Sequence, residues 1–148
     1  MKIHDLMTRD VRTVAPSTSL REAARMMADI DAGSLPVAQN DRLIGMLTDR
    51  DIAVRGVAAG KGPDATVGEA MTPEILYCFD DEEIEDVCEN MADMQVRRLP
   101  VVDRDKRLVG IVSLSDLATK GQTRHAGEAL EGIARPGGAH TQSADGRM

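Results

Sequence analysis

The chain of 148 residues is long enough for one ordinary domain with a buried core, and its 42% hydrophobic and 29% charged residues are typical of a globular protein. A formal net charge of −7 argues against nucleic acid as a partner, and one Tyr, one Phe and no Trp provide too few rings for base stacking. No apolar run approaches the ~20 residues of a membrane span, so no membrane partner is expected.

The first part of the chain predicts the order strand, helix, strand, strand, helix. Ser19 and Glu22 have the spacing of a capping box at the start of the first helix, and Thr48 begins the second helix. Apolar residues at helical spacing predict the inward face of the first helix: Leu20, Ala23, Ala24, Met27 and Ile30. Short apolar runs bounded by turn residues predict the three strands: Val11–Ala15, Ser34–Ala38 and Leu43–Leu47.

The second part of the chain predicts the same order again. Its strands are expected at Ile75–Phe79, Leu99–Val102 and Leu108–Val112. A helix is expected to begin near Glu83, and another begins at Ser113. The apolar residues of the earlier helix predict its inward face: Ile84, Val87, Cys88, Met91 and Met94.

The two parts are an internal duplication. Identical pairs lie 64 residues apart, and one extra residue in the turn 103–106 then makes the offset 65. The pairs include Met7-Thr8 with Met71-Thr72, Leu35-Pro36-Val37 with Leu99-Pro100-Val101, Gly45 with Gly110, and Asp51 with Asp116. We therefore predict an α+β fold of two β-α-β-β-α repeats, 1–58 and 67–120, joined by a linker at 59–66. Because a half of about 60 residues buries too little surface to be stable alone, the two repeats are expected to pack against each other about a pseudo-twofold axis.

Residues 121–148 break the pattern and are rich in Gly, Ser, Thr and Gln. We expect a flexible tail, in which residues 128–134 have the composition of a short helix that Pro136-Gly137-Gly138 would end. Docking of this segment on the body or on a partner is the alternative.

The three motifs that recur in order resemble a tandem pair of cystathionine-β-synthase (CBS) domains, also called a Bateman module. They are the Met-Thr pair, Leu-Pro-Val, and the segments from Gly45 to Asp51 and from Gly110 to Asp116. Leu47–Ile52 and Gln95–Pro100 further resemble small stand-alone bacterial proteins of this class. The resemblance implies binding of adenosine nucleotides (AMP, ADP or ATP) in clefts between the two copies. It also implies assembly into flat homodimers.

Four polar residues and two glycines are the first candidate ligand contacts. Thr48 and Ser113 each precede a predicted helix, where a hydroxyl and free backbone N–H groups suit a phosphate. Asp51 and Asp116 follow one helical turn later. An ionised carboxylate can accept hydrogen bonds from both hydroxyls of a ribose. The resemblance implies these roles for the four residues. Gly45 and Gly110 lack side chains, which allows a ligand or a backbone to approach. Helix capping alone is the alternative for each pair.

Arg97 and Arg98 are further candidates in the second repeat. In some members of the family, basic residues at the matching places contact nucleotide phosphates, for which the planar guanidinium group is suited. The first repeat has Gly33 and Ser34 there, so the two clefts should differ, and the one with Arg97 and Arg98 should bind phosphate better. The alternative is two solvated arginines that balance the acidic segment Asp80–Asp93.

The remaining unusual side chains are better explained by packing. Tyr77 and Phe79 share one face of a predicted strand and form either an adenine-stacking wall or part of the core. Cys78 and Cys88 are expected to be buried small residues, with a redox pair as the alternative. Neither cysteine has a partner at zinc-ligand spacing, so no metal site is expected.

These observations predict a non-catalytic regulatory protein without an obligatory cofactor. Binding of a nucleotide would change the conformation of this protein, and an unidentified protein partner would recognise the changed conformation. The protein would thereby act in energy sensing. No nucleophile is paired with a base by the motifs, and the chain is too short for a catalytic barrel of about 250 residues. The first residues show no secretory signal, which predicts a cytoplasmic location. A ligand-independent dimeric scaffold is the alternative function.

Overall fold

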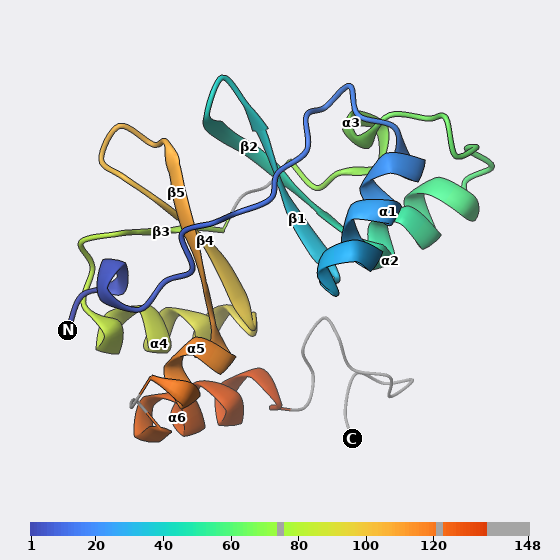
Figure 1. The fold of residues 1–148 in the computed structure, drawn as a ribbon. Coiled ribbons are helices and arrows are strands. Elements are labelled where there is room, and N and C mark those ends of the chain that lie inside the picture. The colour runs from blue at the N-terminus through green and yellow to red at the C-terminus, as the bar shows by residue number, and fades with distance from the viewer. Residues whose placement is uncertain (74–75, 121–122, 136–148) are drawn as a thin grey trace. The chain divides into compact units, whose positions relative to one another are not determined.

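The computed structural model describes residues 1–73, 76–120 and 123–135. Its contacts divide the chain into two compact units, each built mainly from one repeat. The N-repeat unit comprises Val11–Leu76 and Arg104–Leu108, and the C-repeat unit comprises Met1–Asp10, Tyr77–Asp103 and the described residues from Val109 onward. Figure 1 shows that both units contain helices and strands, which confirms the predicted α+β class.

The N-repeat unit has a two-stranded antiparallel sheet covered by helices (Figure 1). Its sheet has a register shift between Val37 and Ala38, and Val14 adds a parallel bridge to Val37. Buried apolar side chains from both strands and the first helix form its core. Its elements are α1 (Leu20–Ile30), β1 (Ser34–Gln39), β2 (Arg42–Thr48), α2 (Asp49–Asp51), η2 (Ile52–Val57, with π-helical hydrogen bonds) and α3 (Val67–Ala70).

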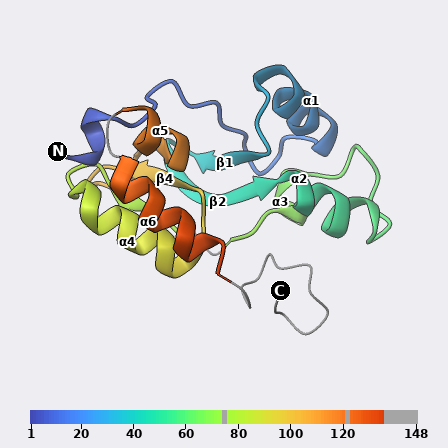
Figure 2. The same cartoon turned by 90° about the horizontal axis from the view of Figure 1, so that it is seen from below.

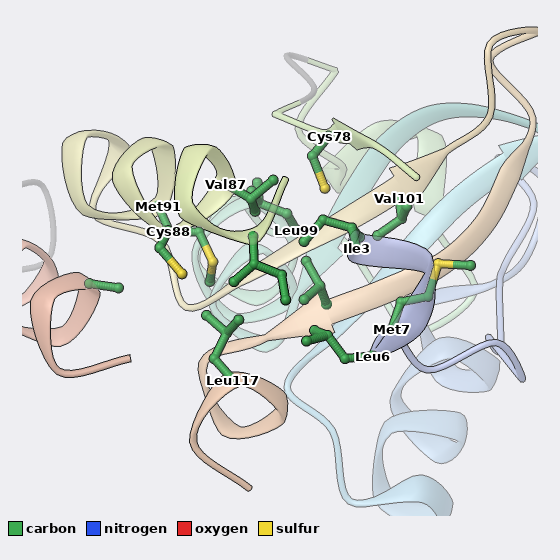
Figure 3. Close-up of a cluster of buried hydrophobic side chains, with 13 residues drawn as sticks. Ile3, Leu6, Met7, Cys78, Val87, Cys88, Met91, Leu99, Val101 and Leu117 are labelled. Carbon is green, nitrogen blue, oxygen red and sulfur yellow. The ribbon is translucent and has the colours of Figure 1, made fainter. Parts of the chain in front are cut away.

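The C-repeat unit has a three-stranded sheet in the order β3-β4-β5, with β3 parallel to β4. Figure 3 shows its core, where side chains from the sheet, the helices and the N-terminal segment converge. Its elements are η1 (Ile3–Asp5), β3 (Cys78–Phe79), α4 (Ile84–Met94), β4 (Arg98–Val102), β5 (Leu108–Ser113), α5 (Leu114–Thr119) and α6 (Thr123–Ile133).

The first residues of each repeat are built into the unit of the other repeat. Thr8 forms an antiparallel bridge with Ile111 in β5, and Thr72 forms the matching bridge with Met46 in β2. Ile3, Leu6 and Met7 are at most 5% exposed within the core of the C-repeat unit (Figure 3). The repeat boundaries read from the sequence therefore do not coincide with the boundaries of the compact units.

Several local predictions need correction. Val14 makes only an isolated bridge, so Val11–Ala15 is not a full strand, and the strand expected from Ile75 is reduced to β3, with Ile75 itself outside the described residues. Ala24 and Ile30 are exposed although they were expected on the inward face of α1. The predicted inward residues of α4 are buried except Met94, which is half-buried.

The tail prediction is also wrong for part of its length. Residues Thr123–Ile133 form α6, which packs against α4 and α5, as both Figure 1 and Figure 2 show. Ala129 is fully buried in the core of the C-repeat unit. The docked alternative therefore describes this helix, whereas residues 136–148 lie outside the described residues.

Both cysteines are free thiols in the core of the C-repeat unit, at 2% and 3% exposure. Burial, reinforced by nearby acidic side chains, raises the pKa of Cys78 to about 12 and that of Cys88 to about 11, against an ordinary 9.0.

Iodoacetamide at pH 8 should therefore leave both cysteines unmodified in the folded protein and alkylate both in urea, as mass spectrometry would record. Rapid alkylation of the folded protein would contradict this burial. Because the thiols ionise more readily in the unfolded chain, stability should fall as the pH rises above about 9.

Candidate functional site

Thr48 and Asp51 form a reciprocal capping box at the end of β2. The amide of Asp51 donates to Oγ1 of Thr48 at 3.0 Å, and the amide of Thr48 donates to Oδ2 of Asp51 at 3.0 Å. Both side chains are half-buried. The predicted Thr-x-x-Asp arrangement thus holds a hydroxyl and a carboxylate together where the strand becomes a helix.

Ser113 and Asp116 repeat this arrangement at the end of β5. The amide of Asp116 donates to Oγ of Ser113 at 3.1 Å, and the amide of Ser113 donates to Oδ2 of Asp116 at 3.0 Å. Both side chains are again half-buried. The structure therefore brings together the two predicted residues of each repeat, and capping is one role that all four demonstrably have.

Gly45 and Gly110 allow a close backbone approach, one of the two roles expected for them. A Cβ on Gly45 would lie 2.8 Å from the carbonyl oxygen of Thr72, and one on Gly110 would lie 2.8 Å from that of Thr8. The sulfur of Met7 would be 2.6 Å from the added atom on Gly110. These glycines thus make room for the crossing Met-Thr segments, and ligand contact by either stays a prediction.

The two capping boxes differ at the free oxygen of the carboxylate. In the N-repeat unit the hydroxyl of Thr72 donates to Asp51, in long hydrogen bonds of 3.4 and 3.5 Å to its two oxygens. Asp116 has no such partner among the described residues, and the matching Thr8 is exposed. Oδ1 of Asp116 is therefore the more available acceptor for a ligand hydroxyl.

The charges next to the two boxes also differ. The amide of Asp49 donates to the carbonyl oxygen of Gly33, and that of Leu114 donates to the carbonyl oxygen of Arg97, both at 2.9 Å. In the N-repeat unit, a carboxylate oxygen of Asp49 would lie 3.1 Å from a Cβ on Gly33. In the C-repeat unit the uncharged Leu114 takes the place of Asp49, and Arg97 takes the place of Gly33. At these two positions an anion would therefore meet a negative charge beside the first box and a positive charge beside the second.

Arg97 and Arg98 are exposed at the start of β4, and the backbone of Arg97 is fixed against the first turn of α5. Their side chains are available to a ligand in solution. Tyr77 and Phe79 pack edge to face with ring centroids 5.6 Å apart, and both are half-buried outside the main core. The pair is therefore not the core packing that the sequence favours, and adenine stacking stays a prediction.

Two features of the site were missed by sequence reasoning. Thr72 supplies a side-chain contact to Asp51, although the repeated Met-Thr pair could have suggested a shared role for both threonines. Asp49 adds a negative charge at the first box and differs from its counterpart Leu114. Comparison of the two repeats, position by position, would have found this difference.

The described residues contain no group of three or more His, Cys, Asp or Glu side chains that could hold a metal ion. Within the same residues, no helix is both long and apolar enough to cross a membrane.

Comparisons with known proteins agree with the duplicated architecture. The sequence profile of the CBS domain matches residues 3–56 and 67–121. The CBS domain-containing protein YhcV of Bacillus subtilis is 42% identical over 132 residues, which are 88% of this chain and 94% of that protein. Hypoxic response protein 1 of Mycobacterium tuberculosis is 43% identical over 116 residues, which are 77% of this chain and 80% of that protein.

Solved structures share the fold. The crystal structure of Hypoxic Response Protein I with two coordinated zinc ions has a TM-score of 0.74 and 41% identity, and covers 80% of this chain and 98% of that one. The crystal structure of CBSX2 in complex with AMP has a TM-score of 0.73 and 28% identity, and covers 83% of this chain and 97% of that one.

Proposed function

This chain belongs to the CBS domain family and carries two CBS repeats, and we propose on that basis that it is a non-catalytic regulatory protein that binds AMP, ADP or ATP. The complex of CBSX2 with AMP supports an adenosine ligand. The observation that carries the proposal is the pair of matching boxes, each of which holds a hydroxyl and a carboxylate at the end of a strand.

We assign the stronger nucleotide site to the C-repeat unit. Asp116 has a free oxygen that can accept ribose hydroxyls, and Ser113 supplies a hydroxyl beside it. Arg97 and Arg98 add two positive charges suited to phosphate. At the N-repeat unit Thr48 and Asp51 are the corresponding contacts, but Asp49 opposes a phosphate there. Gly45 and Gly110 would complete the two sites by letting the Met-Thr segments cross close to the strands that end in the capping boxes.

The absence of catalysis is part of the proposal. The hydroxyls of Thr48 and Ser113 each accept a hydrogen bond from a backbone N–H group. Neither hydroxyl has an imidazole or amine partner among the described residues. A hydroxyl without a base is a weak nucleophile. A nucleotide at these sites is therefore an effector that shifts the conformation, which a homodimer in the cytoplasm would report to a protein partner.

The signal would concern the energy state of the cell. AMP, ADP and ATP share the adenosine that the carboxylates would hold and differ in the phosphates that the arginines would meet. The hypoxic-response name of the M. tuberculosis relative fits such a role.

A calorimetric titration of the wild-type protein with AMP, ADP, ATP, NAD and S-adenosylmethionine tests the ligand class. We expect heat of binding with at least one of the three adenosine nucleotides. Light scattering on the same sample tests the homodimer. If the folded protein binds none of these five compounds, the nucleotide proposal is wrong and a ligand-independent scaffold takes its place.

A further inference from the structure

Helix α6 is fixed to the end of α4 by one side chain. Nε2 of Gln95 donates to the carbonyl oxygens of Gly132 and Arg135, each at 3.2 Å. Gly132 lies in the last turn of α6, where its carbonyl oxygen also accepts the amide of Arg135 at 3.3 Å, and Arg135 follows the helix, so Gln95 adds two hydrogen bonds at the C-terminal end of α6. Gln95 itself ends α4 in a left-handed conformation, with φ of 56°.

Close packing between the two helices accompanies this contact. A Cβ on Gly132 would lie 2.5 Å from Cβ of Ala92, so α6 approaches α4 as only glycine allows. Ala129 is fully buried, and α6 also contacts α5 (Figures 1 and 2). The helix is thus docked through a hydrogen-bonded end, a tight glycine contact and a buried alanine.

The elements beneath α6 are those that carry the proposed nucleotide contacts. Gln95 lies two residues before Arg97, whose carbonyl oxygen accepts the amide of Leu114 at the first turn of α5. Asp116 belongs to α5 itself. Therefore α6 contacts both the helix that leads into the arginine pair and the helix that contains the carboxylate.

The N-repeat unit has no such helix among the described residues. The counterpart of Gln95 is Asp31, which also ends its helix in a left-handed conformation, with φ of 53°. The counterpart of Ala92 is Ala28, which is exposed. Any effect of α6 on ligand binding should therefore be confined to the C-repeat unit.

We propose that α6 is a docked regulatory helix, with Gln95 as its positioning residue, and that AMP at the Ser113–Asp116 site and docking of α6 stabilise each other. This inference rests on the nucleotide function proposed above. Docking holds Arg97 and Asp116 in the geometry that binds the ligand, so the ligand in turn favours the docked helix. Loss of AMP would release α6 from α4 and α5, which gives a partner a surface that depends on the ligand.

Two variants weaken docking in different ways. Gly132→Val adds a side chain where Ala92 leaves no room, and Gln95→Asn keeps a residue that tolerates the left-handed conformation while shortening the amide. Gly127→Val is the matched control, since an added Cβ there meets nothing within 4 Å. We expect AMP to bind the first two variants about fivefold more weakly or worse, and the control as it binds the wild type.

Hydrogen exchange of α6 amides supplies a readout that a merely structural role would not change. AMP should slow exchange across residues 127–135 in the wild type, and both weakened variants should exchange faster without ligand. Faster exchange with unchanged AMP affinity would overturn the coupling and leave the nucleotide function intact. Unchanged exchange in both variants would show that these contacts do not dock α6. No AMP binding by the wild type would overturn both proposals.

Discussion

Replacing Leu6 by alanine is expected to destabilise the C-repeat unit by about 2–5 kcal/mol, although the sequence places the residue in the first repeat. Leu6 is 1% exposed and lies in the same core as Val87, Leu99 and Leu117 (Figure 3). The alanine would leave a cavity in that core. Urea unfolding followed by circular dichroism measures the loss in free energy of unfolding, and hydrogen exchange locates it.

The location of the loss is the informative result. Exchange should accelerate in α4 and β4, which share the core with Leu6, and remain unchanged in α1, which belongs to the N-repeat unit. Asp10→Ala is the control, because this residue is exposed in the same N-terminal segment. Acceleration in α1 alone would show that Leu6 belongs to the first repeat after all.

Replacing Arg97 and Arg98 together by alanine is expected to weaken ATP binding by about 10- to 100-fold, because charge-assisted hydrogen bonds to phosphate are about twice as strong as neutral ones. Adenosine, which has no phosphate, should bind the double variant as it binds the wild type. Calorimetric titration with both ligands separates the two cases. Thermal unfolding should change little, since both side chains are exposed and the bond to Leu114 uses the backbone of Arg97.

Arg25→Ala provides the matched control for charge. Arg25 is exposed on α1 of the N-repeat unit, so its loss removes one positive charge from the protein and changes no residue of the C-repeat unit. It should leave ATP affinity within about twofold, because Arg25 is not among the proposed phosphate contacts and a change of net charge alone acts weakly through physiological salt. Equal weakening of ATP and adenosine by the double variant would argue against contact between the arginines and phosphate.

The repeated order of elements was predictable because each element has a local signal. Strands β1, β2, β4 and β5 lie within one or two residues of their predicted bounds, and α1 begins beside the predicted cap Ser19. The capping boxes were visible for the same reason, since their hydrogen bonds join residues three apart. Comparisons confirm the family that these motifs suggested.

The contacts that local patterns do not determine were the ones missed. Nothing near Leu6 indicates that its partners lie about 80 to 110 residues away, because an apolar residue signals burial and not its neighbours. The docking of α6 depends on the fit between Gly132 and Ala92, whereas glycine in the sequence suggested a tail. The unequal charge of the two boxes depends on the approach of Asp49 to Gly33, two residues that are well separated in the sequence.

Calorimetric titration of AMP into the matched variants Asp116→Asn and Asp51→Asn tests the central claim most directly. Both variants weaken the same kind of capping box, so their effects on stability should be similar, at about 1 kcal/mol. If the Ser113–Asp116 site binds the nucleotide more strongly, Asp116→Asn should abolish or greatly weaken the tighter binding event, and Asp51→Asn should leave that event intact. Equal AMP binding by both variants and the wild type would contradict the assignment of these carboxylates to a nucleotide site.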